Sequence, residues 1–127
     1  MDLKDKGWSR FIRSFSFAVN GIKLTWEKEQ NFRIHVFIAF FVVIVSLFLP
    51  LSAIEWALII FSIFGMLALE MMNTAIERTV DLVTGEYHPL AKMAKDIAAG
   101  AVFVYAIMTV IIGLIIILPK LLSKWGL

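Results

Sequence analysis

The stretch WALIIFSIFGMLALE (56–70) continues into MMNTAIERTVD (71–81) without an intervening turn residue, and residues 56–69 carry no formal charge. In an α-helix, successive side chains are rotated by about 100°. If the whole stretch is one helix, three carboxylates, an amide and a hydroxyl therefore lie on one face roughly 100° wide. They belong to Glu70, Glu77, Asp81, Asn73 and Thr74. Ionisable side chains at the end of a membrane helix are costly and usually functional. The pattern therefore predicts a membrane helix that carries a polar site. The simpler alternative is that these residues only mark where the helix leaves the bilayer.

Length and composition predict one membrane-embedded domain, residues 1–127. The chain is 61% hydrophobic and only 17% charged, which is too apolar for a soluble fold of 127 residues. Uncharged runs cover 34–54, 56–69 and 97–119, and a bilayer core of about 30 Å takes roughly 20 helical residues. The second run reaches that length only by including polar residues from Glu70 onward. We expect an all-α integral membrane protein with transmembrane helices at about 31–49, 53–84 and 90–119.

Residues 7–27 or so predict an amphipathic helix that lies on the membrane surface. Its apolar side chains fall on one face: Trp8, Phe11, Ile12, Phe15, Val19, Ile22 and Trp26. Basic residues gather before the first span and between the second and third spans, whereas residues 50–55 have none. The N-terminus and the second loop are therefore expected on the cytoplasmic side of the cell membrane. No signal peptide is apparent, and a chain without Cys has no disulfide or thiolate site.

Acidic and basic side chains gather at one predicted membrane face. They are Glu29, Glu70, Glu77, Asp81 and Asp96, with Arg10 and Lys95. Mg²⁺ is commonly held between one or two carboxylates and the phosphates of a substrate. Phosphoryl transfer needs such a metal site, a cation on the transferred phosphate and a group that orients the attacking hydroxyl. A proton-coupled carrier would more often place its acids near the midplane of a chain with internal repeats, and no repeat is visible.

Simpler structural roles stay open for several of these residues. Glu29 precedes Arg33 by four positions, so the two could form a salt bridge on a helix. The charged block 92–96 could be a basic collar beneath a membrane helix. His35, at the start of the first span, is more typical of an interfacial hydrogen-bonding residue than of a ligand.

The polar motifs resemble those of the prokaryotic diacylglycerol kinase family of small membrane enzymes. The core motif is Glu70-x-x-Asn73-Thr-Ala-Ile-Glu77-x-x-x-Asp81. It is followed by Glu86-Tyr87-His88 and by Ala94-Lys95-Asp96-x-Ala-Ala, and it is preceded by Arg10 and Trp26-x-x-Glu29-x-x-Phe32-Arg33. The resemblance therefore covers nearly the whole chain.

The resemblance implies an ATP-dependent lipid kinase. Each protomer of a homotrimer would have a surface helix and three membrane helices, with active sites shared between adjacent protomers and no nucleic acid as partner. Glu70 would be the general base. Glu29 and Glu77 would hold Mg²⁺, and Asn73 would be a catalytic residue that supports this metal site. Groups at the nucleotide would be Arg10, Phe17, Glu29, Glu77, Glu86, Tyr87, His88, Lys95 and Asp96. Groups at the lipid substrate would be Arg10, Glu70 and Ala99.

The substrate implied by the resemblance is undecaprenol. The motifs His-Pro-Leu-Ala-Lys (88–92) and Lys-Asp-x-Ala-Ala-Gly-Ala-Val (95–102) are similar to the Gram-positive branch of the family, whose members phosphorylate this polyprenol. Phe17, Ala18 and Ala99 stand where the diacylglycerol-specific branch has hydroxyl side chains, which favours a lipid with one hydroxyl and an apolar tail. Diacylglycerol is the alternative substrate, and a non-enzymatic membrane oligomer is the alternative of another class.

Overall fold

The computed structural model describes residues 3–126 and is entirely helical over that range. Four helices follow one another: α1 (Leu3–Lys28), α2 (Gln30–Leu47), α3 (Ala53–Val83) and α4 (Pro89–Lys124). By length and composition, α2, α3 and α4 can each cross a membrane. The all-α fold with three membrane helices after an N-terminal helix is therefore confirmed.

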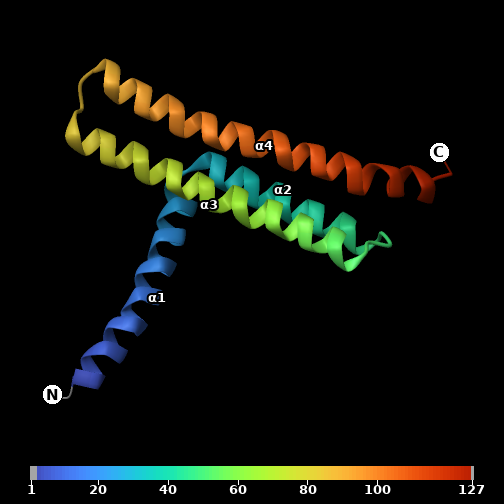
Figure 1. The fold of residues 1–127 in the computed structure, drawn as a ribbon, viewed down its shortest axis with the longest axis horizontal. Coiled ribbons are helices and arrows are strands. Elements are labelled where there is room, and N and C mark those ends of the chain that lie inside the picture. The colour runs from blue at the N-terminus through green and yellow to red at the C-terminus, as the bar shows by residue number, and fades with distance from the viewer. Residues whose placement is uncertain (1–2, 127) are drawn as a thin grey trace.

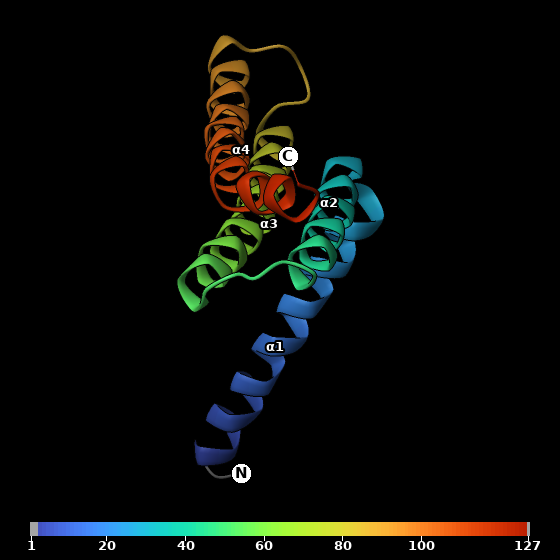
Figure 2. The same cartoon turned by 90° about the vertical axis from the view of Figure 1, so that its right-hand side faces the viewer.

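The three membrane helices lie side by side, and α1 leaves them as a separate arm (Figures 1 and 2). The most extensive packing is between α3 and α4, and α2 packs mainly against α3. Helix α1 contacts α2 and α3, close to its own C-terminal end. Its apolar face remains uncovered within the chain, and Trp8, Phe11 and Phe15 are all exposed. Such a face suits a helix that lies in the membrane interface.

A one-residue break at Glu29 separates α1 from α2. Its backbone is extended (φ −114°, ψ 109°), while the Arg33 Nη1 atom donates to the carbonyl oxygens of Trp26 at 2.7 Å and Glu27 at 3.1 Å. The Glu29–Arg33 salt bridge that the spacing suggested is therefore wrong. Glu29 is the N-cap of α2, and its carbonyl still accepts from the Arg33 amide at 3.3 Å. The two side chains do not pair, because Glu29 contacts Arg78 and the Arg33 guanidinium satisfies carbonyl groups at the end of α1.

The connection between α2 and α3 is held by a capping box at the start of α3 and by two lysine side chains of α4. A capping box links Ser52 and Glu55, because the Glu55 amide donates to Ser52 Oγ at 3.2 Å and the Ser52 amide donates to Glu55 Oε1 at 3.0 Å. From α4, Lys120 Nζ lies 2.5 Å from Glu55 Oε1 and donates to the Pro50 carbonyl at 2.7 Å. Lys124 Nζ donates to the Phe48 carbonyl at 2.7 Å. These contacts explain why α4 continues past its predicted end at 119, through Pro119, to Lys124.

Close packing of α3 on α4 depends on a glycine. The Tyr105 hydroxyl crosses from α4 and donates to the Phe61 carbonyl at 2.8 Å, passing directly over Gly65. A Cβ atom at position 65 would lie 1.9 Å from that hydroxyl oxygen. The small residues 98–101 were expected to provide such an approach, but within the chain only Ala98 of this run is buried.

Candidate active site

Glu70 is a buried carboxylate in the membrane part of α3, and only 6% of the residue is exposed. Its Oε1 atom lies 3.3 Å from Nε2 of His35 on α2. An isolated carboxylate is very unfavourable in an apolar environment, and the imidazole offsets part of that cost. The sequence predicted a hydrogen-bonding role for His35 without identifying its partner.

Asn73 and Glu77 lie one and two turns further along the same face of α3. The Asn73 Nδ2 atom donates to Glu77 Oε1 at 3.4 Å. The Asn73 Oδ1 atom is buried and has no hydrogen-bond partner within the described part of the chain. A buried acceptor without a donor is rare in folded proteins and calls for an explanation such as an ion.

The break between α1 and α2 brings Glu29 to α3. Arg78 Nη2 donates to Glu29 Oε1 at 3.1 Å, across 49 positions of sequence. Sequence reasoning did not identify Arg78, because it follows Glu77 by one position and falls outside the polar face that helical periodicity defines. No local spacing connects it to Glu29, so only the packing of the α1–α2 junction against α3 could identify the pair.

The α3–α4 connection contributes a second group of charges. Lys95 Nζ on α4 lies 2.6 Å from Asp81 Oδ1 on α3, and Lys92 Nζ lies 2.5 Å from Asp96 Oδ2 one turn along α4. The predicted nucleoside residues 86–88 are exposed in the short turn between the helices. His88 is also the N-cap of α4, since its Nδ1 accepts from the Leu90 amide at 3.1 Å.

Three predicted site residues are not brought to Glu70 within one chain. Arg10 and Phe17 are exposed on α1, whose N-terminal part lies well away from α3 and α4 in both views (Figures 1 and 2). Ala99 is exposed on α4. The remaining predicted residues are divided between two places: Glu29, Asn73 and Glu77 lie near Glu70, and the others lie around Lys95 and the 84–88 turn.

The oxygen atoms near Glu70 suit a divalent cation that also binds a substrate phosphate. Within residues 6–126, no group of three or more carboxylates and imidazoles converges closely enough to enclose a metal. Mg²⁺ does not need such a cage, because it is usually held by one or two carboxylates, waters and phosphate oxygens. Glu77 and the unpartnered Oδ1 atom of Asn73 lie on one face of α3, and Glu29 reaches the same helix at Arg78, so these residues offer a partial set of hard oxygen ligands.

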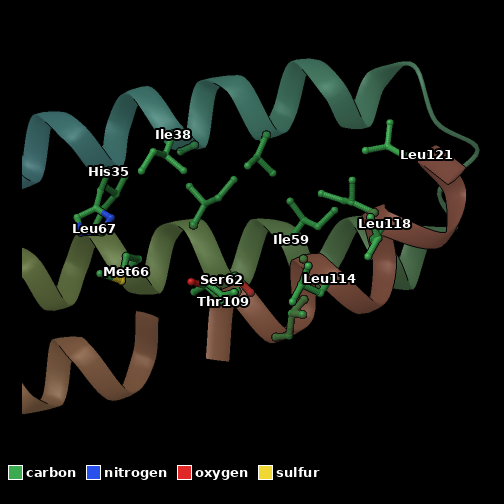
Figure 3. Close-up of a pocket in the computed structure, with 17 residues that line it drawn as sticks. His35, Ile38, Ile59, Ser62, Met66, Leu67, Thr109, Leu114, Leu118 and Leu121 are labelled. Atoms are coloured by element: carbon green, nitrogen blue, oxygen red, sulfur yellow. The ribbon is translucent and has the colours of Figure 1, made fainter. Parts of the chain in front are cut away.

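An apolar cavity of about 380 Å³ lies between α2, α3 and α4 and ends beside the Glu70 partner His35 (Figure 3). Leu118 and Leu121 line its other end. The two hydroxyl groups in its wall are already engaged by their own helices: Ser62 Oγ donates to the Leu58 carbonyl at 2.8 Å, and Thr109 Oγ1 donates to the Ala106 carbonyl at 2.7 Å. Apart from His35, the wall therefore offers no free polar group.

Fold and site together define a multi-pass membrane protein in which a buried carboxylate separates an apolar cavity from a cluster of charged groups. This arrangement suits chemistry on an amphipathic molecule, whose tail needs an apolar environment and whose head meets a water-soluble reactant.

Residues 16–117 match the prokaryotic diacylglycerol kinase family, so the chain belongs to that family. It is a lipid kinase that uses ATP, as the sequence predicted, and the alternative of a non-enzymatic membrane oligomer is rejected.

Individual relatives extend over most of the chain. It is 52% identical to the undecaprenol kinase of Bacillus subtilis strain 168 over 123 residues, which is 95% of this chain and 100% of that protein. It is 41% identical over 125 residues to a diacylglycerol kinase of Synechocystis, covering 95% of this chain and 71% of that protein. Identity to the diacylglycerol kinase of Escherichia coli strain K12 is 32% over 105 residues, or 83% of this chain and 86% of that protein.

Proposed function

We propose that this lipid kinase transfers the γ-phosphoryl group of ATP to undecaprenol at the cytoplasmic face of the cell membrane, giving undecaprenyl phosphate and ADP. The product would feed the pool of lipid carrier used in cell-wall synthesis. The observation that carries the proposal is the position of Glu70, which is buried on α3. It contacts His35 at the end of the apolar cavity, and it shares one face of its helix with Asn73 and Glu77. The likeness to the undecaprenol kinase of Bacillus subtilis over its full length supports the choice of lipid.

In this mechanism Glu70 is the general base. The part of the lipid tail next to the head group lies in the cavity, and the hydroxyl faces the Glu70 carboxylate. The hydroxyl oxygen attacks the γ-phosphorus, the bond from the γ-phosphorus to the bridging oxygen breaks, and ADP leaves with that bonding pair. Glu70 accepts the hydroxyl proton. A positioned base of this kind typically contributes about 10²–10⁴-fold to the rate.

Glu29, Glu77 and the Asn73 Oδ1 atom would hold Mg²⁺, which supplies positive charge to the phosphates of ATP when it is bound. Lys95 would contact the phosphates after exchanging its present partner Asp81 for them. Glu86, Tyr87, His88 and Asp96 lie at the exposed end of the bundle, where a nucleoside can approach from water.

We propose that the protein is a homotrimer in which each active site takes residues from a neighbouring protomer. These residues are Arg10, Phe17 and Ala99. Two features support a shared site. These residues are exposed and separate from Glu70 within the chain, and the membrane helices leave large apolar side chains such as Phe41, Phe64 and Phe103 uncovered. Closed rings are formed by heterologous contacts of this type.

Diacylglycerol is the second candidate substrate, because relatives at 41% and 32% identity bear that name. The cavity favours a polyprenol, since its two hydroxyl groups already donate to backbone carbonyls. They are not free to bind the ester carbonyls that a diacylglycerol carries and a polyprenol lacks. An apolar site rejects added polar groups only weakly, so we expect preference for undecaprenol with residual activity on diacylglycerol.

The decisive experiment offers both lipids with radiolabelled ATP in mixed micelles. Wild-type protein should phosphorylate undecaprenol with the higher kcat/KM. Glu70→Gln keeps the size of the side chain but cannot accept a proton at neutral pH, so it should lose at least about 10²-fold in kcat while still binding Mg·ATP. A Glu70→Gln variant that keeps more than about a third of the wild-type rate would contradict the mechanism. Faster transfer to diacylglycerol would contradict only the substrate preference.

A further inference from the structure

His35 connects the apolar cavity with the proposed general base. Its imidazole is on α2, lines the end of the cavity and contacts the Glu70 carboxylate of α3 at 3.3 Å (Figure 3). The histidine side chain is 26% exposed and the glutamate side chain 7%. No other cationic or imidazole side chain among residues 6–126 lies within ion-pair distance of Glu70. Arg78 pairs with Glu29, and Lys95 pairs with Asp81.

We propose that His35 is a positioning residue, which holds one oxygen of the Glu70 carboxylate at the end of the cavity and leaves the other oxygen facing the hydroxyl of the bound lipid alcohol. The proposal rests on the function proposed above, in which Glu70 is the base. The contact involves only Glu70 Oε1, so the second oxygen remains available to accept a proton.

Glu70 needs such a partner because its surroundings otherwise repel it. Glu77, a second acid, lies two turns further along the same face of α3, and the cavity beyond His35 is apolar. Without His35, the carboxylate would be free to rotate away from the cavity. An imidazole carries a proton on Nε2 in one neutral tautomer as well as in the imidazolium. The contact can therefore hold the carboxylate whether or not His35 is charged.

A reacting group displaced by about 1 Å can lose on the order of 10²-fold in rate. His35→Leu removes the contact but keeps an apolar side chain suited to a membrane helix. We expect kcat to fall about ten- to a hundredfold, with little change in KM for ATP. A loss that appears in KM for ATP with kcat unchanged, or a variant that keeps more than about a third of the wild-type kcat, would overturn the proposal.

Two amide variants test the contact in the full-length protein without relying on His35→Leu. The Gln side chain places an amide nitrogen near the position of Nε2, whereas Asn is shorter by one methylene. His35→Gln should recover kcat to within about threefold of wild type, while His35→Asn should resemble His35→Leu, since small displacements of a reacting group are costly. Equal rates for the Gln and Asn variants would contradict a positioning role, even if His35→Leu failed to fold.

The double variant His35→Leu/Glu70→Gln distinguishes an action through Glu70 from an independent one. Residues that act as a unit are strongly non-additive, so the double variant should be no slower than Glu70→Gln alone. A further loss of tenfold or more would show that His35 does not act through Glu70. If Glu70→Gln is inactive and His35→Leu is normal, this inference fails and the proposed function survives. If Glu70→Gln remains active, the proposed function itself fails.

Discussion

Gly65→Ala should destabilise the packing of α3 on α4, and the structure sets the scale of the effect. The added methyl carbon would lie 1.9 Å from the Tyr105 hydroxyl oxygen and 2.4 Å from Cζ of the same ring. Favourable contacts between heavy atoms lie near 3.5–4.0 Å, so the ring must move by more than 1 Å. That movement breaks the 2.8 Å hydrogen bond from Tyr105 to the Phe61 carbonyl.

Overpacking of this kind typically costs about 1–3 kcal/mol, and a hydrogen bond between membrane helices contributes about 0.6 kcal/mol on average. Replacing Gly by Ala inside a helix returns about 1 kcal/mol. We therefore expect the free energy of unfolding to fall by roughly 0.5–2.5 kcal/mol for Gly65→Ala. Tyr105→Phe should cost only the hydrogen bond, about 0.6 kcal/mol.

The free energy of unfolding can be measured by titrating the protein in mixed micelles with sodium dodecyl sulfate while the helical signal is recorded. Gly113→Ala is the matched control, because nothing in the chain lies within 4 Å of a Cβ atom at that position. In a Tyr105→Ala background the clash is absent, so Gly65→Ala should become neutral or stabilising. An equal loss from Gly65→Ala in both backgrounds would refute the reasoning.

The remaining predictions concern the metal, the shared site and the lipid. Changing Glu29 or Glu77 to Ala should raise the Mg²⁺ concentration needed for half-maximal rate, and the double change should raise it little further than the worse single change. Arg78→Leu removes the ion pair but no carboxylate, so it should leave the Mg²⁺ requirement near wild type. Arg10→Ala and Glu70→Gln chains, each inactive alone, can be mixed in equal amounts and reassembled. If each site takes Arg10 and Glu70 from neighbouring protomers, about a quarter of the sites should regain activity. No recovery of activity would show that both residues act from one chain. Phe17→Tyr with Ala99→Ser should shift the ratio of kcat/KM for the two lipids towards diacylglycerol, because new hydroxyls can bind its ester groups; an unchanged ratio would contradict the role given to these positions.

The helices could be predicted from the sequence because their cause is local. Uncharged runs of membrane length define α2 and α4, and the polar stripe on α3 follows from helical periodicity alone. The short turn before Pro89 is also local, since proline restricts the residue that precedes it. The extension of α4 to Lys124 was not predictable in this way. It depends on contacts of Lys120 and Lys124 with carbonyl groups some 70 positions earlier, at Pro50 and Phe48.

The partners of the site residues could not be predicted because they come from helix packing. Periodicity places Glu70 on the polar face of α3, but it does not reveal that His35 of α2 lies opposite. The same holds for Arg78, which satisfies Glu29 across the α1–α2 junction. In that pair the local prediction failed for a physical reason, since the chain leaves helical geometry at Glu29. The same break lets the Glu29 carboxylate reach Arg78 on α3. The irregularity that made the local prediction fail is therefore also what brings this acidic residue to the helix that carries Glu70.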